Sequence, residues 1–223
     1  MSDAYFRSRL APDPRRDRLW DHLARHLAAY VPARARVVEL GAGYCHFINR
    51  VPAARRVAVD LSADLPRWAA PGVEACVEDA VAHVERVARG TYDFVFASNL
   101  LEHLEWPQLD RLAAGVRRAL RPGGLFGLVQ PNFRLAPGRY FDDYTHRTIF
   151  TDVSLTDWLS ASGFEIAASV PRFLPLTVKS RLGALTFLVP LYLRSPWRPF
   201  AGQMFVLARR PGDGVPEAPG GAA

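Results

Sequence analysis

The stretch RVVELGAGYCH at residues 36–46 decides the fold of this chain. The apolar residues over 36–40 predict a buried parallel strand, and two glycines one residue apart, Gly41 and Gly43, predict a tight turn into a helix over about 44–51. Because glycine has no Cβ atom, a ligand can approach the backbone there, and the start of the helix offers unpaired N–H groups. An ordinary strand-to-helix turn uses the same residues, so the glycines alone leave both interpretations open.

The acid before the glycines narrows the kind of ligand. A dinucleotide fingerprint needs a third glycine, and this chain has His46 at that position. The order Glu39-x-Gly41-x-Gly43 resembles motif I of the class I S-adenosylmethionine-dependent methyltransferases. The resemblance implies that the turn passes under the methionine part of the cofactor and that Glu39 approaches its amino group. The family often has a further glycine where this chain has Cys45, whose side chain then has to fit within the turn.

Acidic residues also follow the next two predicted strands, over 55–60 and 73–77. Asp60 ends the first of these, where its two carboxylate oxygens would accept bonds from the hydroxyls of a ribose; a surface acid that closes a strand is the alternative. The resemblance places Asp79 near the adenine, with a helix N-cap as the alternative. It implies a cofactor site made of Glu39, Gly41, Ala42, Gly43, Asp60, Leu61, Asp79, Ala80, Ser98 and Asn99.

The rest of the chain continues the alternation of strands and helices. Apolar runs predict further strands over 92–98, 125–130, 164–170 and 203–209, and helices over 15–30, 107–120 and 151–162. This alternation predicts an α/β fold with a doubly wound, mostly parallel sheet. The resemblance adds that the sheet has seven strands, the last of them antiparallel. We expect a single domain over residues 1–210 and a disordered Gly/Pro/Ala-rich tail over 211–223.

Charge and sequence do not favour a nucleic-acid partner. The chain has 223 residues and a formal net charge of +6, but its basic residues are scattered and form no stripe. Residues 98–103 read Ser-Asn-Leu-Leu-Glu-His, which resembles small-molecule members of the family. They do not form the Asn/Asp-Pro-Pro-Tyr/Phe motif of enzymes that methylate the amines of nucleic-acid bases. We expect no binding to nucleic acid.

Metal binding and membrane insertion are not indicated either. Cys45 and Cys76 form no C-x-x-C pair, and no metal-ligand spacing is visible, so we expect no metal site. No apolar run is long enough to span a bilayer, and the first residues lack the apolar core of a signal peptide. We therefore expect a cytoplasmic protein.

The segment 131–150 is longer than the core fold needs and is rich in aromatic and proton-exchanging residues. Long loops at the ligand edge of a sheet usually carry function. Within it, residues 142–147 resemble the Asp-x-Thr-His segment of methyltransferases associated with bacterial glycan or natural-product pathways. We expect His146 to deprotonate a hydroxyl acceptor, with Asp143 to orient it, and His103 is a second candidate. A structural histidine is the alternative for both.

The segment 171–202 also exceeds the core fold, and it combines an apolar run with flanking arginines. This composition suits an interfacial helix, a substrate lid or a dimer face, and a helix packed on the domain is the plainer alternative. An interfacial helix would imply a lipid-linked acceptor and peripheral contact with the inner membrane face.

These patterns and the resemblance predict an S-adenosylmethionine-dependent methyltransferase. We expect methyl transfer by in-line displacement to a small-molecule or glycan acceptor, at a hydroxyl oxygen. Two other functions stay open. A nicotinamide-dependent reductase would also use Asp60, although His46 and the lack of a Tyr-x-x-x-Lys dyad oppose it. A non-catalytic module would bind the cofactor without turnover.

Overall fold

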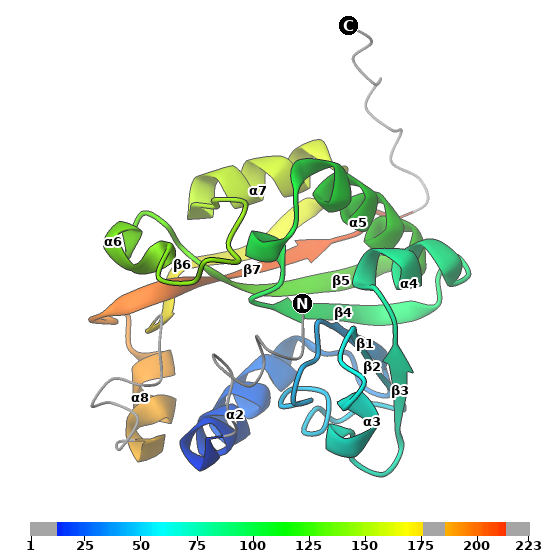
Figure 1. The fold of residues 1–223 in the computed structure, drawn as a ribbon, viewed down its shortest axis with the longest axis horizontal. Coiled ribbons are helices and arrows are strands. Elements are labelled where there is room, and N and C mark those ends of the chain that lie inside the picture. The colour runs from blue at the N-terminus through cyan, green and yellow to red at the C-terminus, as the bar shows by residue number, and fades with distance from the viewer. Residues whose placement is uncertain (1–12, 176–185, 213–223) are drawn as a thin grey trace, which may run out of the picture.

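Seven strands form one sheet in the computed structural model, which describes residues 13–175 and 186–212 (Figure 1). In spatial order the strands are β3 (Val73–Val77), β2 (Arg55–Asp60), β1 (Arg36–Leu40), β4 (Tyr92–Ser98), β5 (Leu120–Pro131), β7 (Ala201–Arg209) and β6 (Glu165–Pro175). Neighbouring pairs from β3 to β5 are parallel, whereas β7 is antiparallel to both β5 and β6. The predicted α/β fold, with its seven strands and antiparallel last strand, is confirmed.

Helices cover both faces of the sheet, as Figure 1 shows. One face carries α4 (Ala80–Arg86), α5 (Trp106–Ala119) and α7 (Asp152–Ala161), and the other carries α2 (Pro14–Leu27), α3 (Leu65–Trp68) and α8 (Val189–Arg194). Short helices complete the described elements: η1 (Ala28–Tyr30), η2 (Leu101–His103), α6 (Pro137–Tyr140) and η4 (Thr186–Leu188).

The alternation of side chains along the strands produces two cores, one on each face of the sheet. In β4, Val95 and Ala97 belong to the core under α4, α5 and α7, whereas Phe94 and Phe96 belong to the core over α2. Successive residues of a strand point to opposite faces, so a strand that is buried on both sides is apolar throughout. This explains why the central strands were recognisable as continuous apolar runs.

The predicted helix over 44–51 is wrong. Residues 43–50 form a series of turns, although the glycines do turn the chain at the predicted place. Cys45 has a φ of +57°, in the left-handed region, which interrupts a right-handed helix. The N–H of Ile48, which a helix would pair with a carbonyl, instead donates to the Glu39 side chain at 2.9 Å.

Other predicted bounds shift by a few residues. The helix predicted over 15–30 is α2 followed by η1, and Thr151, predicted as a helical residue, is the N-cap of α7. The strand predicted over 125–130 starts earlier, since β5 begins at Leu120. The strand predicted over 164–170 continues to Pro175, so the first part of segment 171–202 belongs to β6.

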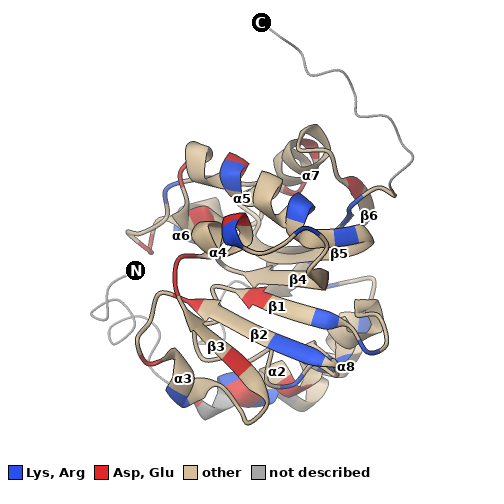
Figure 2. Cartoon of the chain, turned by 90° about the vertical axis from the view of Figure 1, so that its right-hand side faces the viewer, with Lys and Arg blue, Asp and Glu red and all other residues tan. Residues whose placement is uncertain are grey.

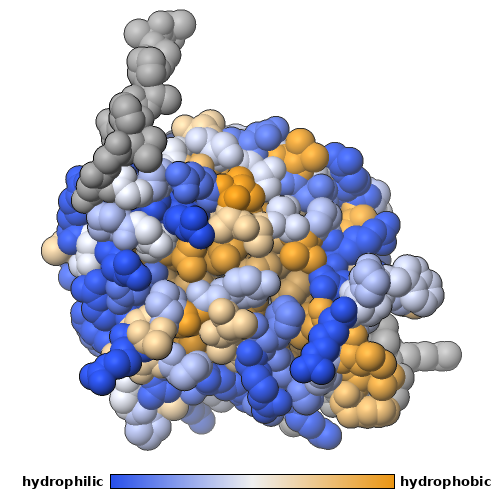
Figure 3. Space-filling model, turned by 180° about the vertical axis from the view of Figure 1, so that it is seen from behind, coloured by the Kyte–Doolittle hydropathy of each residue, from blue (hydrophilic) through white to orange (hydrophobic). Residues whose placement is uncertain are grey.

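The described remainder of segment 171–202 packs on the domain, which agrees with the alternative of a helix packed on the domain. In α8, which lies against α2, Leu193 is buried. The outward side remains apolar, with Phe187, Leu191, Trp197 and Phe200 all exposed, and Figure 3 shows apolar side chains gathered over α8. The predicted interfacial, lid and dimer roles stay predictions, and residues 176–185 lie outside the described residues, as does the tail over 213–223. No helix within the described ranges is long and apolar enough to cross a bilayer.

We predict that Gly41→Ala destabilises the fold, because Gly41 has a φ of +69° and an added Cβ would lie 3.1 Å from the Leu100 Cδ1. The left-handed conformation alone costs an alanine about 1–2 kcal/mol. Urea denaturation should show a loss of that size in the free energy of unfolding. The matched control is Gly138→Ala, where the added Cβ meets nothing within 4 Å and φ is not positive. Equal effects of the two substitutions would contradict this account.

Candidate functional site

The predicted cofactor residues lie together at one edge of the sheet. Parallel pairing aligns Leu40 with Val59 and with Ala97, and Asp60 with Val77, so β1 to β4 end side by side. The strand order reverses at β1, since β2 lies on one side and β4 on the other, and ligands of open α/β sheets bind at such a switch point. The structure therefore brings the ends of these four strands to the place where a ligand is expected.

Charge is distributed unevenly along the strands. Figure 2 shows acidic residues towards the carboxyl ends of β1 and β2 and basic residues at the opposite ends. Glu39 and Asp60 are the acids, and both are buried; Arg36, Arg55 and Arg56 are the basic residues. A ligand with a positive group would be attracted to the carboxyl edge.

The bend after β1 is held by the two buried carboxylates. The Asp60 Oδ2 accepts a hydrogen bond from the Gly43 N–H at 2.9 Å, and its Oδ1 accepts one from the Ser62 N–H at 2.9 Å. The N–H groups of Gly41 and Ala42 donate to the Val59 carbonyl at 2.9 and 3.0 Å. The N–H groups of the bend are therefore bound to the end of β2, through the Val59 carbonyl and the Asp60 side chain. Our prediction that the start of a helix offers unpaired N–H groups here is wrong. Each Asp60 oxygen has a second lone pair that can accept from a ligand.

Burial dominates the electrostatics of this bend. The pKa of Glu39 is raised to about 8, because burial disfavours its charged form; the bond from Ile48 opposes this rise, and the charge of Asp60 adds to it. Burial likewise raises the pKa of the Cys45 thiol to about 12. Cys45 is fully buried and packs in the core with Phe47 and Phe96, which is how its side chain fits at a backbone position with positive φ.

The remaining predicted cofactor residues have structural partners. Asp79 is the N-cap of α4, because its Oδ1 accepts from the N–H groups of Val81 and Ala82 at 2.9 and 3.0 Å. The N-cap alternative is therefore what the structure shows, and the adenine contact stays a prediction. Ala80 is buried at the start of the helix, and Leu61 is 52% exposed beside Asp60.

Ser98 and Asn99 extend this edge beyond β4. The Asn99 Nδ2 donates to the Ser98 Oγ at 3.2 Å, and the Gln203 Nε2 donates to the Asn99 Oδ1 at 2.8 Å. Gln203 lies in β7, so the amide of Asn99 links two strands that are far apart in the sequence. Asn99 has a φ of +50°, which asparagine tolerates better than most residues.

The predicted catalytic residues lie next to this edge, because the loop over 131–150 folds back onto η2. The carbonyl of Glu102 accepts from the N–H groups of Arg147 and Thr148 at 2.7 and 3.2 Å. The Thr148 Oγ1 donates to the Leu104 carbonyl at 2.6 Å. This attachment brings the rings of His103 and His146 to a centroid distance of 5.0 Å. The structure thus unites both candidate bases in one cluster.

Asp143 is linked to His103 through Thr145. The Thr145 Oγ1 donates to the Asp143 Oδ1 at 2.6 Å and lies 2.9 Å from the His103 Nδ1. A threonine hydroxyl has a single proton, and here that proton points to Asp143, so the His103 Nδ1 is the donor of its bond. The lone pair of His103 is therefore on Nε2. The predicted orientation of His146 by Asp143 stays a prediction.

Glu102 is the residue of this cluster that our sequence reasoning missed. Its carboxylate is almost fully buried, and its Oε1 lies 4.0 Å from the His146 Nε2. Burial raises the pKa of Glu102 to about 8, and the charge of Asp143 adds to this rise. Burial also lowers the pKa of His103 to about 4, with a smaller contribution from His146. The adjacent glutamate and histidine in the sequence were a signal, but only folding shows that His146 joins them.

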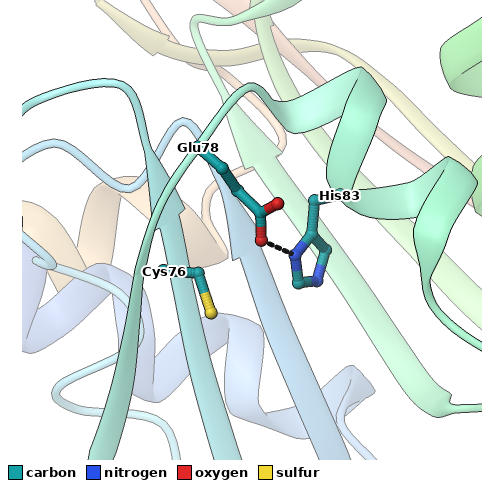
Figure 4. A group of neighbouring side chains, drawn as sticks. All are labelled: Cys76, Glu78 and His83. Atoms are coloured by element: carbon teal, nitrogen blue, oxygen red, sulfur yellow. Dashed lines mark hydrogen bonds and ion pairs between the residues drawn. The ribbon is translucent and has the colours of Figure 1, made fainter.

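The structure also brings potential metal ligands together where we expected none. In the described part of the chain two groups of three place their ligand atoms within 4.8 Å of one another: Glu102, His103 and His146, and Cys76, Glu78 and His83. Figure 4 shows the second group, in which the His83 Nδ1 is 2.7 Å from the Glu78 Oε1. Arg86 also donates to that oxygen at 2.6 Å, and the His83 Nε2 is 2.8 Å from the Tyr92 hydroxyl. These bonds fasten α4 to the sheet.

Comparison with known proteins identifies the family. A family model described as a methyltransferase domain matches residues 13–169, which is more than half of the chain. The chain belongs to the class I S-adenosylmethionine-dependent methyltransferases. The matched region contains the bend, its two carboxylates and the histidine cluster.

Named relatives and solved structures agree with this family. A malonyl-[acyl-carrier protein] O-methyltransferase from Methylococcus capsulatus is 33% identical over 157 residues, which are 63% of this chain; the match spans only 54% of that relative's length. An S-adenosylmethionine-dependent methyltransferase from Archaeoglobus fulgidus has a TM-score of 0.62 at 16% identity, covering 85% of this chain and 94% of the other.

A further similar structure was solved with a ligand. The 1,6-didemethyltoxoflavin-N1-methyltransferase from Burkholderia thailandensis contains bound 1,6-didemethyltoxoflavin and S-adenosylhomocysteine. Its TM-score is 0.57 at 19% identity, covering 86% of this chain and 78% of the other. At this level of identity the likeness shows the shared fold.

The bend of this methyltransferase fits the charge of its cofactor, S-adenosylmethionine. Glu39 and Asp60 are buried at the ligand edge, and no basic side chain of the described residues contributes to the pKa of Glu39. The sulfonium and ammonium groups of the cofactor are positive, so their approach would favour the ionised form of this acid.

We predict that the stability of the cofactor-free protein depends on pH through Glu39. Its folded pKa, about 8, exceeds the unfolded value of about 4.5, so the folded state alone holds the proton between these pH values. Raising the pH through this window therefore destabilises the fold. Glu39→Gln removes this dependence, so its free energy of unfolding should rise relative to the native protein by at most about 1.4 kcal/mol per pH unit.

Urea denaturation between pH 5 and pH 8 measures this difference. The control is Glu165→Gln on β6, where the side chain is exposed. If the curves for Glu39→Gln and the native protein stay parallel across this range, the assignment to Glu39 is wrong.

Proposed function

We propose that this methyltransferase transfers the methyl group to a hydroxyl oxygen of a small-molecule or glycan acceptor. The observation that carries the proposal is the cluster of His103, His146 and Glu102 beside the end of β4. A hydroxyl group must lose its proton as it attacks, and imidazole is the side chain best suited to accept it near neutral pH.

Methyl transfer requires alignment above all. S-adenosylmethionine supplies a methyl group on a positively charged sulfur, which is already activated for displacement. In our proposal the cofactor is held at the edge of the sheet by Glu39, Asp60 and the turn at Gly41–Gly43. The residues that enclose it are Asp79, Ala80, Leu61, Ser98 and Asn99. The loop over 131–150 holds the acceptor, and such positioning can supply several kcal/mol of the barrier reduction.

Proton removal is the second task, and the histidine cluster performs it in this proposal. His146 stands between His103 and Tyr140, with ring centroids at 5.0 and 4.6 Å. The acceptor oxygen would form its bond to the methyl carbon as the bond from that carbon to the cofactor sulfur breaks, which leaves S-adenosylhomocysteine, while the proton of the acceptor passes to the cluster. Thr145, held by Asp143, orients His103.

The relative from Methylococcus capsulatus favours a second candidate acceptor. Its name describes O-methylation of a malonyl group on an acyl-carrier protein. A carboxylate acceptor is already ionised at neutral pH and needs no base. The buried histidine cluster distinguishes the two candidates, because only a hydroxyl acceptor gives it a proton to accept.

For localisation and partners we propose a cytoplasmic protein without a nucleic-acid partner. Contact with the inner membrane face or with a second copy would use the exposed apolar side chains Phe187, Leu191, Trp197 and Phe200. Flotation of the full chain with anionic vesicles tests the membrane contact, and recovery entirely in the soluble fraction would count against it.

We predict that Asp60→Asn weakens the binding of S-adenosylmethionine about tenfold, because a charged acceptor of hydrogen bonds becomes neutral; this loss corresponds to about 1.4 kcal/mol. Isothermal titration calorimetry measures the affinity. Asp64→Asn is the control, since Asp64 is exposed nearby and its side chain makes no capping bond. Equal affinities for all three proteins would remove Asp60 from the cofactor site.

We predict that His146→Ala lowers turnover with a hydroxyl acceptor roughly 100-fold or more, within the usual range for a lost base, and leaves the affinity for the cofactor unchanged. Transfer of radiolabelled methyl groups to a panel of sugars and phenols, with malonyl-loaded carrier protein as the carboxylate comparison, measures both candidates. His26→Ala, on the opposite face in α2, is the control. Normal turnover of His146→Ala would show that the base lies elsewhere.

A further inference from the structure

Three side chains with metal-binding atoms converge beside the ligand edge of the sheet. Glu102 and His103 come from η2, and His146 comes from the loop over 131–150. One potential ligand atom from each lies within 4.8 Å of the others, and the His146 Nε2 is 4.0 Å from the Glu102 Oε1. Ligands of a tetrahedral zinc site are about 3.4 Å apart, given metal–ligand distances near 2 Å. Small side-chain rotations would shorten the distances between the three ligand atoms to this value.

The chemical state of His103 suits a ligand. Its Nδ1 donates to the Thr145 Oγ1, which in turn donates to the Asp143 carboxylate. The lone pair is consequently on Nε2. Metal-binding histidines usually donate their other ring N–H to a carboxylate or another acceptor, and that partner fixes the ring and its tautomer. Asp143 and Thr145 provide such a relay here.

Glu102 supplies a second, independent observation. Its side chain is almost fully buried, and within the described ranges its Oε2 has no hydrogen-bond partner. A buried carboxylate is costly unless it is paired, hydrogen-bonded or bound to a metal. No arginine or lysine of the described residues forms an ion pair with it, and the nearest basic group is His146. A cation bound between the three side chains would give the Glu102 carboxylate a partner.

We propose that Glu102, His103 and His146 bind one divalent first-row transition-metal ion. Two imidazoles and a carboxylate favour zinc, manganese or iron, whereas magnesium and calcium prefer oxygen ligands alone. Three protein ligands leave at least one coordination position open, which is the arrangement of catalytic zinc sites. This proposal replaces our expectation that the chain has no metal site.

The group of Cys76, Glu78 and His83 is a weaker candidate. Glu78 is already bound by Arg86, and both ring nitrogens of His83 have partners in Glu78 and Tyr92. A metal ion would have to displace these bonds and would meet the positive charge of Arg86. It therefore serves as the internal comparison for the test.

The catalytic consequence rests on the hydroxyl acceptor of the proposed function and would replace its base step, whereas the binding of metal rests on neither. A cation at this cluster would make an adjacent acceptor hydroxyl lose its proton more readily. The two histidines would then act as ligands and the proton would pass to solvent, while the oxygen forms its bond to the methyl carbon and the bond from that carbon to the cofactor sulfur breaks. Asp143 and Thr145 would be positioning residues.

The test uses the full chain without a polyhistidine tag, stripped with a chelator and dialysed. Titration with Co²⁺ followed by visible absorption, and with Zn²⁺ against a chromophoric chelator, should show one equivalent bound. We expect Glu102→Gln and His146→Ala to weaken the affinity for the metal ion roughly 100-fold or more. Thr145→Val should weaken it roughly 10- to 100-fold, which is the usual effect of removing a hydrogen bond that orients a metal-binding histidine. Mg²⁺ should not compete at equal concentration.

The matched controls are His83→Ala, in the other group, and His26→Ala on α2; both should bind as the native protein does. Circular dichroism verifies that each variant is folded, and His146→Gln replaces any His146→Ala protein that is not. Absence of stoichiometric binding, or affinity that falls in His83→Ala and not in Glu102→Gln, overturns the proposal. Because neither titration needs an acceptor, a failure to methylate hydroxyl groups would refute the proposed function alone.

Discussion

Two buried carboxylates control the bend on which the ligand edge depends. Three residues in five, Gly41, Gly43 and Cys45, have positive φ, so the backbone there cannot form a regular helix. Its N–H groups still need partners, because an unsatisfied buried group costs free energy. Glu39 and Asp60 provide acceptors through their side chains, and Val59 does so through its carbonyl. The same acids that shape the bend therefore place two carboxyl groups at this edge, and the approach of a sulfonium group would favour their ionised forms.

The position of the histidine cluster also depends on a few backbone hydrogen bonds. One carbonyl, that of Glu102, accepts from two consecutive N–H groups of the loop over 131–150. This attachment places His146 against His103 and within 4.0 Å of the buried Glu102 side chain. Both halves of the proposed reaction are thereby fixed to the end of β4, since η2 follows that strand directly. The cofactor edge and the histidine cluster need no movement of separate domains to meet.

The sequence predicted the sheet well because its central strands are buried on both faces and so are mostly apolar, as in β1 and β4. It failed over 44–51, where local helix signals do not reveal that a distant side chain, Glu39, captures a backbone N–H. The role of Asp79 could not be decided from the sequence, since an N-cap and a contact with a ligand use the same residue type. The histidines were recognised singly, but the partnership of His146 with Glu102 depends on how a long loop returns to the sheet, which no local pattern encodes.

The position of β7 has a consequence for synthesis on the ribosome. It is the last strand of the described sheet in the sequence, yet it lies between β5 and β6. Until residues 201–209 emerge, both neighbouring strands present unpaired edges, and the apolar edge of β5 resembles a template for association with other chains. A nascent chain can thus build the cofactor half early but cannot close its sheet co-translationally before β7 leaves the exit tunnel.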